Sequence, residues 1–388
     1  MELTPKQQVV ERIREAKNIL VLTHQNPDGD ALGSILALEL FLESIGKKTL
    51  AVCNDVAPDV FSFLPNVSKI AQNFSGARDF IISLDTSEVK AEKIMYRTEG
   101  GKLNIIITPK NGQFVPQMVE FPEGTFNFDL IIVLDTPDLE RTGTPFEKNP
   151  DVFYETPVIN IDHHASNDNF GKINLVDLTS TSTAEILVSL MEALSPGKSP
   201  FTEDIATALL TGIITDTGSF QNANTTPKSL TVAAQLVAAG ARREEIIRRI
   251  FKTRSLSTLR LWGRALVNLH ADSGDGFVWT TLRKSDFLEV GASEAEASGV
   301  IDDLLKTVSG ADFVMLLSER GTSVFGSLRS VKMSFDVAKI ATIFNGGGHV
   351  LAAGFELKNT TLSESSKMIV QRVREQKKAM NGTIKTVV

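Results

Sequence analysis

The chain has almost no cysteine: among its 388 residues, Cys53 is the only one. A single cysteine excludes a disulfide within the chain, and such low cysteine usage is typical of a reducing compartment such as the cytoplasm. Cys53 ends the strand-like apolar run Thr49-Leu-Ala-Val-Cys53. We therefore expect it to be a buried core residue rather than a reactive thiol.

Long apolar segments and an excess of basic residues are also missing. No apolar stretch approaches the ~20 residues that a membrane-spanning helix needs. The N-terminal residues Met1-Glu-Leu-Thr-Pro-Lys6 lack the basic start and the apolar core of a signal peptide, so we expect a cytoplasmic protein without membrane contact. The formal net charge of −7 disfavours a long duplex nucleic acid as partner, because proteins that bind one usually display a broad basic face. A short anionic substrate remains compatible with this charge.

The first half of the chain alternates strand-like apolar runs with amphipathic helical segments. The expected strands are 18–23, 48–53, 79–85, 103–108, 129–135 and 157–161. The expected helices are 5–17, 31–45, 182–194, 203–214 and 227–239. This alternation predicts an α/β fold with a mostly parallel sheet flanked by helices.

The second half predicts a smaller α+β domain. The charged segment 242–250 has helical apolar spacing and is expected to begin the connection to it. Beyond it, the expected strands are 265–271, 277–282, 311–318 and 323–329, and the expected helices are 294–307, 336–343 and 361–379. We therefore predict a first domain over 1–238, a helical linker over 239–262 and a second domain over 263–388.

Two segments of the first half are nearly the same. The run from Asp79 to Thr86 and the run from Asp129 to Thr136 agree at six of eight positions, and either could bring an aspartate to the edge of the sheet. The turn-rich segment between them contains Gly100-Gly101 and Asn111-Gly112. Asn-Gly between apolar runs predicts a β-hairpin. We interpret 87–127 as an insertion.

Three of the five histidines and several aspartates follow apolar strands or border helices. These candidate site residues are His24, Asp28, Asp30, Asp135, Asp162, His163, His164 and Asp216. A lone aspartate in such a place is more often a helix cap, and Asp28-Gly-Asp30 before a helix fits that alternative. The carboxyl ends of parallel strands meet at one edge of a sheet, so the whole set is expected to converge there.

Imidazoles together with carboxylates suit divalent transition metals, and the chain has no set of thiolates for a structural zinc. Two ions about 3.5–4 Å apart, sharing a carboxylate, would hold a hydroxide and neutralise the oxygens of a phosphoryl group. Mixed nitrogen and oxygen ligands favour Mn²⁺, with Mg²⁺ or Co²⁺ as alternatives. The residues therefore predict metal-assisted hydrolysis of a phosphoester.

In this order, the motifs resemble those of the DHH phosphoesterase superfamily, whose name-giving tripeptide is seen here as Asp162-His163-His164. Ser327-Leu-Arg329-Ser330 and Gly346-Gly-Gly-His349 resemble the DHHA1 domain that accompanies it. The resemblance extends over about 15–357. The two-domain layout is most similar to the group of oligoribonucleases and phosphoadenosine-phosphate phosphatases called nanoRNases.

The resemblance implies a role for each candidate residue. Two metal ions would be held by His24, Asp28, Asp30, Asp135, His163 and Asp216. Asp135 would bridge the two ions, with His24 and Asp28 on the side of the first ion. His164 would face the substrate phosphate, and Asp162 would orient the neighbouring histidines.

The resemblance also implies a phosphate site in the second domain, formed by Arg329, Ser330, Gly346, Gly347, Gly348 and His349. A surface ion pair is the alternative role for Arg329, and a flexible turn is the alternative for the three glycines. His270 has no metal-ligating neighbours in the sequence, and we expect a structural or surface role for it.

The chain departs from the family pattern by offering both Asp85 and Asp135 as the bridging aspartate. We choose Asp135, because the segment from Pro137 to Gly143 continues like the family pattern and Asp162 follows closely. The insertion leaves the preferred substrate length open.

The resemblance implies an enzyme that hydrolyses short oligoribonucleotides from the 3′ end and also acts on 3′-phosphoadenosine 5′-phosphate. A phosphodiesterase for cyclic di-AMP or its linear dinucleotide is the alternative. A nucleotide-binding protein without catalysis is disfavoured, because every ligand position carries the expected residue type. The sequence leaves the oligomeric state open, a homodimer included.

Overall fold

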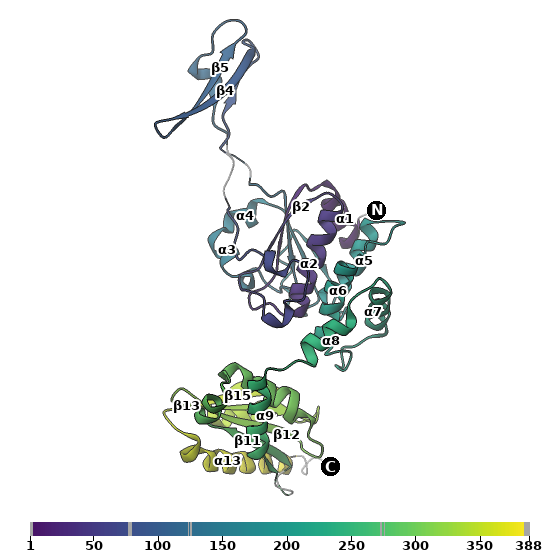
Figure 1. The fold of residues 1–388 in the computed structure, drawn as a ribbon, viewed down its shortest axis with the longest axis vertical. Helices are drawn as coiled ribbons and strands as arrows, with labels where there is room; N and C mark the ends of the chain where they lie inside the picture. The colour runs from purple at the N-terminus through teal and green to yellow at the C-terminus, as the bar shows by residue number, and fades with distance from the viewer. Residues whose placement is uncertain are drawn as a thin grey trace. The chain divides into compact units, whose positions relative to one another are not determined.

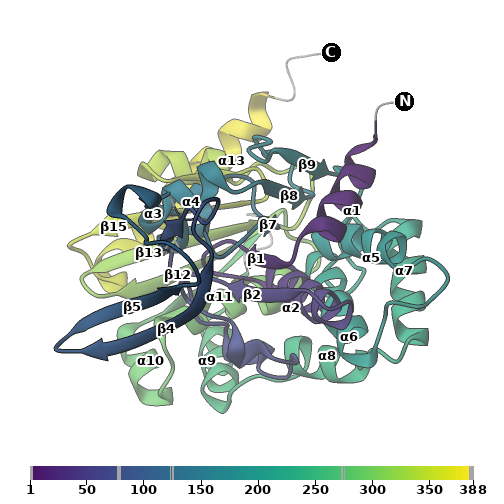
Figure 2. The same ribbon diagram turned by 90° about the horizontal axis from the view of Figure 1, so that it is seen from above.

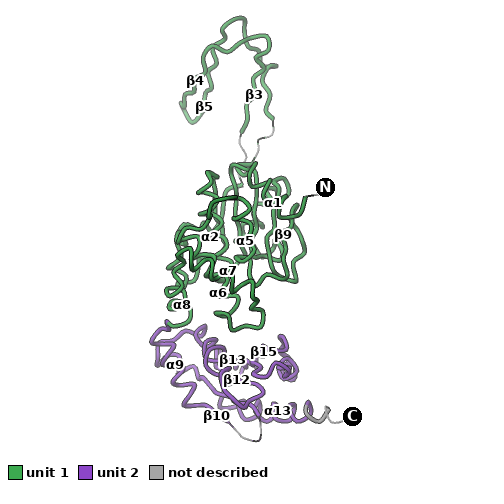
Figure 3. The backbone as a smooth tube through the Cα atoms, turned by 90° about the vertical axis from the view of Figure 1, so that its right-hand side faces the viewer, with its two compact units in different colours: residues 1–252 green, residues 253–388 purple. Residues whose placement is uncertain are grey.

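The computed structural model describes residues 3–76, 80–122, 124, 126–271, 274 and 276–383. The chain divides into two compact units, residues 1–252 and residues 253–388 (Figure 3). The division falls within the predicted linker 239–262. In the described part of the chain, no helix has the length and apolar character that crossing a membrane requires.

Unit 1, coloured from purple through teal to green in Figure 1, is built on a five-stranded sheet in which all neighbouring strands run parallel. In spatial order the strands are β2 (Lys48–Val52), β1 (Asn18–Leu22), β7 (Leu130–Leu134), β8 (Val158–Asp162) and β9 (Ile173–Val176). The predicted parallel sheet is therefore confirmed. The sequence prediction missed β9, a strand of four half-buried residues that includes the polar Asn174.

Helices cover both faces of this sheet (Figure 2). The larger helices are α1 (Pro5–Glu15), α2 (Gly29–Ser44), α5 (Thr183–Leu194), α6 (Glu203–Asp216), α7 (Pro227–Ala238) and α8 (Arg243–Phe251). Ile19 and Val21 of β1 pack with α1, α2, α5 and α6, whereas Leu20 and Leu22 pack with α4 (Pro150–Glu155) on the other face. Burial on both faces explains why the strands are uninterrupted apolar runs.

Two glycines allow α2 and α6 to pack unusually closely. A Cβ atom on Gly33 of α2 would lie 2.3 Å from the carbonyl oxygen of Ala208 in α6. A Cβ atom on Gly212 of α6 would lie 2.4 Å from Oδ1 of Asp30 and 2.7 Å from Cβ of Ala184. The absence of side chains at these positions lets α2, α5 and α6 meet around Asp30.

The insertion 87–127 and the residues just before it form two small antiparallel ladders that are separate from the five-stranded sheet. β3 (Ser83–Leu84) pairs with β6 (Val119–Glu120), and β4 (Ala91–Glu99) pairs with β5 (Lys102–Pro109). Asp79, the first residue of the predicted strand 79–85, lies outside the described residues. Among the described residues of that run only Ser83 and Leu84 form a strand, whereas β7 extends over Leu130–Leu134, so the near-identity of the two sequences does not extend to their structure.

The hairpin turn is Gly100-Gly101, with φ angles of 60° and 75° and with Glu99 opposite Lys102. Positive φ at both central residues is what a two-residue hairpin turn of type I′ requires. The prediction of a hairpin at Asn111-Gly112 was wrong, because no strand follows until β6. The side chain of Asn111 instead accepts a hydrogen bond from the backbone N–H of Lys90 (3.2 Å).

Unit 2 contains a six-stranded mixed sheet. In spatial order its strands are β10 (His270–Ala271), β11 (Phe277–Leu282), β12 (Phe313–Arg320), β13 (Ser323–Ser330), β15 (Ala352–Lys358) and β14 (Gly347–His349). β11 and β12 run parallel, and the other pairs are antiparallel. The helical segments are α9 (Leu256–Val267), α10 (Lys284–Val290), an irregular stretch from Glu294 to Thr307, α12 (Ala338–Ala341) and α13 (Leu362–Thr383). The predicted α+β character is confirmed.

One element of unit 2 was predicted wrongly. Residues 265–267, expected to begin a strand, complete helix α9, and only His270 and Ala271 are extended. Leu261 and Ala265, four residues apart, are fully buried on one side of α9, which is helical spacing.

We predict that Gly33→Ala destabilises unit 1 by about 1–3 kcal/mol, because the new Cβ atom would collide with the backbone of α6. Urea-induced unfolding measures the change. Gly263→Ala is the control, since Gly263 lies in α9 with nothing within 4 Å of the added atom, and it should be neutral or stabilising by up to about 1 kcal/mol. Wild-type stability of Gly33→Ala would contradict the close packing of α2 and α6.

Candidate metal centre

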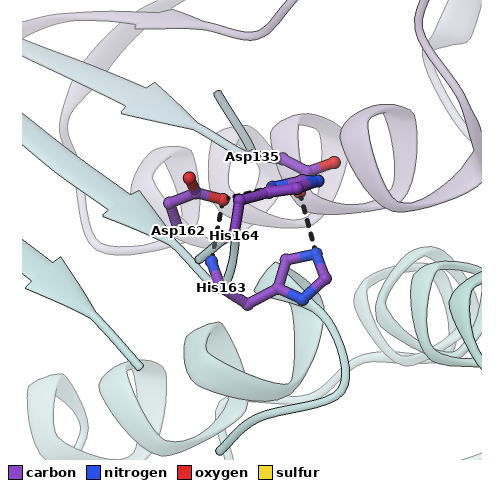
Figure 4. A group of neighbouring side chains, drawn as sticks. All are labelled: Asp135, Asp162, His163 and His164. Atoms are coloured by element: carbon purple, nitrogen blue, oxygen red, sulfur yellow. Dashed lines mark hydrogen bonds and ion pairs between the residues drawn. The ribbon is translucent and has the colours of Figure 1, made fainter. Parts of the chain in front are cut away.

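The predicted ligands of unit 1 gather where the parallel strands end. His24 follows β1, Asp135 follows β7, and Asp162-His163-His164 ends β8 and continues beyond it. These three strands are neighbours in the sheet. Figure 4 shows the side chains of Asp135, Asp162, His163 and His164 lying together.

The side chains form three groups in which the candidate ligand atoms lie within 4.8 Å of one another. The groups are His24, Asp28 and Asp135; Asp30, His163 and Asp216; and Asp135, Asp162, His163 and His164. All eight predicted site residues of unit 1 therefore converge. Asp85, the rejected alternative to Asp135, belongs to none of these groups, and it accepts a hydrogen bond from the N–H of Ser87 (2.9 Å).

Asp135 lies between the other ligands, and its two oxygens face different histidines. Oδ2 is 3.7 Å from Nε2 of His24, and Oδ1 is 3.5 Å from Nε2 of His163. Asp135 is only 1% exposed. One carboxylate is thus available to two positions at once, which is the geometry that a bridging ligand needs.

The backbone of Asp135 is in the left-handed region, with a φ angle of 55°. Residues other than glycine rarely adopt this conformation, which costs on the order of 1–3 kcal/mol. The N–H of Asp135 donates to the carbonyl of Ile161 in the neighbouring strand (3.0 Å) and so holds the strained residue in place.

Asp162 organises the segment after β8. Its buried carboxylate accepts hydrogen bonds from the backbone N–H of His163 (2.7 Å), from Nδ1 of His164 (2.8 Å) and from Nδ2 of Asn167 (2.6 Å). The bond to His164 leaves Nε2 of that partly exposed ring available for other contacts. Asn167 was not identified from the sequence.

Asp28 and Asp30 border the first turn of α2 and make different contacts. Oδ1 of Asp28 accepts from the N–H groups of Asp30 and Ala31, both at 3.0 Å, so Asp28 is indeed the N-cap of α2. Capping uses one oxygen and leaves the other for a metal. Asp30 is fully buried and accepts from the N–H groups of Thr183 (2.6 Å) and Ala184 (3.0 Å) at the start of α5.

The ionisation of the site reflects this crowding of charges. Burial alone would lower the pKa of His163, but Asp135, Asp216 and Asp30 outweigh it and raise the pKa to about 11. For His24, burial is likewise outweighed, chiefly by Asp135, and the pKa rises to about 9. Burial tends to raise the pKa of Asp135, yet the two histidines hold it well below its usual range.

Two carboxylates and a third imidazole of the site also have raised pKa values. Burial, followed by the charges of Asp135 and Asp216, raises the pKa of Asp30 well above its usual value. Burial is also the largest cause of the raised pKa of Asp216. The hydrogen bond to Asp162 raises the pKa of His164.

The side chains fit a pair of divalent cations. Nε2 of His163 is buried and makes no hydrogen bond to any described residue. It nevertheless lies 3.2 Å from Oδ2 of Asp216, 3.5 Å from Oδ1 of Asp135 and 3.9 Å from Oδ2 of Asp30. A buried nitrogen without a hydrogen bond, facing several carboxylates, is the arrangement that a cation would satisfy.

The predicted phosphate-binding residues lie on β13 and on or next to β14, the two strands that flank β15 in unit 2. Arg329 of β13 and His349 of β14 both pair with Ala352 of β15, so the two side chains lie on the same face of the sheet. Nε and Nη2 of Arg329 form ion pairs with Asp302 (2.6 and 3.1 Å). Ser330 Oγ donates to the carbonyl of Lys332 (2.5 Å).

The three glycines differ in their surroundings. A Cβ atom on Gly346 would lie 2.3 Å from the carbonyl oxygen of Gly354, and one on Gly348 would lie 2.5 Å from that of Ala352. Gly347 has open space around it. Close strand approach therefore requires glycine at positions 346 and 348, whether or not a phosphate binds.

Two further residues take the structural roles expected for them. Cys53 is buried, and burial raises the pKa of its thiol to about 11, which makes it poorly reactive. His270 stacks on Trp279 in unit 2, with ring centroids 4.2 Å apart.

The sequence analysis did not identify Thr183 as a residue of the metal centre, although its side chain contacts Asp135.

In the comparison with known proteins, one family model matches residues of unit 1 and a second family model matches residues of unit 2. The model of the DHH family N-terminal domain matches residues 18–213, and the model of the DHHA1 domain matches residues 280–385. The chain is 30% identical over 359 residues to a protein of Thermus thermophilus named bifunctional oligoribonuclease and PAP phosphatase NrnA, covering 92% of this chain and 90% of that protein.

Two further proteins are similar. The chain is 25% identical over 371 residues to the cyclic-di-AMP phosphodiesterase PdeA of Listeria monocytogenes, covering 95% of this chain and 49% of that protein. The crystal structure of an exopolyphosphatase-related protein from Bacteroides fragilis covers 97% of both chains with a TM-score of 0.71 and 23% identity, and so shares the fold. The chain belongs to the DHH family of phosphoesterases and carries a DHHA1 domain.

Proposed function

We propose that the chain is a two-metal phosphoesterase that hydrolyses short oligoribonucleotides from the 3′ end and also acts on 3′-phosphoadenosine 5′-phosphate. The observation that carries the proposal is the position of Asp135, with one oxygen toward His24 and the other toward His163. The substrate class is supported by the likeness to the Thermus thermophilus oligoribonuclease and PAP phosphatase, which extends over both domains.

Six side chains would hold the ions: His24, Asp28, Asp30, Asp135, His163 and Asp216. Two divalent ions bound there would supply Lewis-acid polarisation of the phosphoryl group and activation of water. The mixed imidazole and carboxylate donors favour Mn²⁺, with Mg²⁺ or Co²⁺ as alternatives.

The remaining residues bind and orient the substrate. Asp162 holds Nδ1 of His164, so that Nε2 of the same ring is free to contact a phosphate oxygen. Arg329 and His349, which share one face of the unit 2 sheet, would contact a substrate phosphate together with Ser330 and the glycines 346–348. Since Asp302 already pairs with Arg329, phosphate binding would have to share or replace that ion pair.

Hydrolysis of cyclic di-AMP or its linear dinucleotide is the second candidate function. It is favoured by the likeness to the Listeria monocytogenes cyclic-di-AMP phosphodiesterase, which covers 95% of this chain. Both candidate functions use the same metal chemistry and the same ligands, and they differ in the substrate alone.

We predict that, with Mn²⁺, the purified chain hydrolyses RNA of two to five nucleotides and 3′-phosphoadenosine 5′-phosphate faster than cyclic di-AMP. Side-by-side initial rates with product chromatography measure the preference. Turnover of cyclic dinucleotides alone would select the second candidate. Nucleotide binding without metal-dependent turnover would favour a binding protein without catalysis.

We predict that His163→Ala lowers kcat by at least about 100-fold, because the variant loses a ligand and leaves Asp30 and Asp216 without their nearest imidazole. Circular dichroism should show that the fold is retained. His270→Ala is the matched control, because it removes an imidazole that stacks on Trp279 in unit 2, and it should keep the wild-type rate. Full activity of His163→Ala would contradict the proposed centre.

We predict that EDTA abolishes hydrolysis and that added Mn²⁺ restores it. Mn²⁺ should also raise the melting temperature of unit 1, because an ion that binds the folded state at 100 times its Kd stabilises it by about 2.7 kcal/mol. Differential scanning calorimetry with and without the ion measures the shift. If Mn²⁺ leaves the melting temperature unchanged and hydrolysis persists in EDTA, the chain has no metal centre of the proposed kind.

A further inference from the structure

The N-terminus of helix α5 lies against two of the candidate metal ligands. Ser182 is the N-cap of this helix, and its Oγ accepts from the N–H of Glu185 (3.2 Å). The next two N–H groups, of Thr183 and Ala184, donate to Oδ2 (2.6 Å) and Oδ1 (3.0 Å) of Asp30. Both oxygens of Asp30 are therefore fixed by the backbone of α5.

The side chain of Thr183 also contacts the other buried carboxylate. Its hydroxyl donates to Oδ1 of Asp135 at 3.1 Å, and Thr183 and Asp135 are 0% and 1% exposed. The same Oδ1 atom lies 3.5 Å from Nε2 of His163. One residue of α5 thus bonds through its backbone to an aspartate of α2 and through its hydroxyl to the aspartate that follows β7.

The other close partners of Asp135 are themselves candidates for metal or substrate contacts. His24 and His163 are proposed ligands, and His164, with Nδ1 at 3.7 Å from Oδ1, is proposed to contact substrate. A histidine that binds a cation through a ring nitrogen cannot donate a hydrogen bond from that nitrogen. The hydroxyl of Thr183 is free of this conflict and can stay bonded to Asp135 when ions bind.

We propose that Thr183 is a positioning residue, which holds Asp30 and Asp135 in the orientation that binds two cations. The inference rests on the proposed function, since it concerns the same metal centre. The branched Cβ of threonine restricts the χ1 angle and so fixes the direction of the hydroxyl. Loss of the hydroxyl leaves Oδ1 without this donor, and the carboxylate of Asp135 is then freer to rotate away from its bridging orientation.

The test compares Thr183→Val, which keeps the shape but removes the donor, with Thr183→Ser, which keeps the donor. Mn²⁺ affinity is measured on the full chain by counting free Mn²⁺ with electron paramagnetic resonance. We expect Thr183→Val to weaken Mn²⁺ binding by about 10–100-fold, and Thr183→Ser to stay within about threefold of wild type. Thr183→Ala serves as a second variant without the hydroxyl if Thr183→Val does not fold.

Thr211→Val is the matched control. Thr211 is fully buried in α6, and its hydroxyl donates to the carbonyl of Thr207 within the same helix (2.8 Å). The substitution makes the same chemical change in unit 1 without touching a ligand oxygen. It should leave the affinity for Mn²⁺ unchanged, even if the metal-free protein melts at a lower temperature.

Three outcomes have distinct meanings. Wild-type Mn²⁺ affinity in Thr183→Val would overturn the positioning role while leaving the proposed function intact. An equal loss of affinity in Thr183→Ser and Thr183→Val would show that the hydroxyl is not the determinant, and would also overturn it. A wild-type chain that binds no Mn²⁺ would overturn the proposed function, and the role of Thr183 with it.

Discussion

The concentration of buried negative charge at the carboxyl ends of β1, β7 and β8 is the constraint on which the rest of unit 1 depends. Carboxylate oxygens of Asp30, Asp135 and Asp216 all lie 3.2 to 3.9 Å from one nitrogen atom, Nε2 of His163. Buried carboxylates are costly unless they are paired or hydrogen-bonded. Much of the local structure supplies that compensation.

Several elements of unit 1 contribute to the placement and stabilisation of these buried carboxylates. The N-terminus of α5 supplies two N–H groups and the positive end of its helix dipole to Asp30. Gly33 and Gly212 let α2 and α6 come close enough to place Asp30 there. The left-handed backbone of Asp135 turns the carboxylate between the histidines, and a hydrogen bond to Ile161 holds it. Under the proposed function, these carboxylates are already oriented for two cations, and the binding of the cations stabilises unit 1.

The sequence predicted the parts of this arrangement that depend on local pattern. Uninterrupted apolar runs followed by His and Asp placed the ligands at strand ends, and the parallel sheet then brought them together. The choice of Asp135 over Asp85 agrees with the positions of the two residues in the structure, because only Asp135 lies among the histidines. The mostly apolar residues 265–271 are compatible with a strand as well as with the end of a helix, and the burial of Leu261 and Ala265 on one side of α9 distinguishes the two. Gly100-Gly101 and Asn111-Gly112 both have the composition of a hairpin turn, and local pattern does not show which of them lies between paired strands. Thr183 could not have been found by pattern, because its contact with Asp135 joins positions 48 residues apart.

The bridging role of Asp135 is the central claim, and the number and magnetic coupling of bound Mn²⁺ ions test it most directly. Electron paramagnetic resonance of the Mn²⁺-loaded wild-type chain should show two ions with an exchange-coupled spectrum. Asp135→Asn should lose the coupling, because a neutral amide is a poor bridge between two cations. A single uncoupled ion in the wild type, or a coupled pair that persists in Asp135→Asn, would contradict the account.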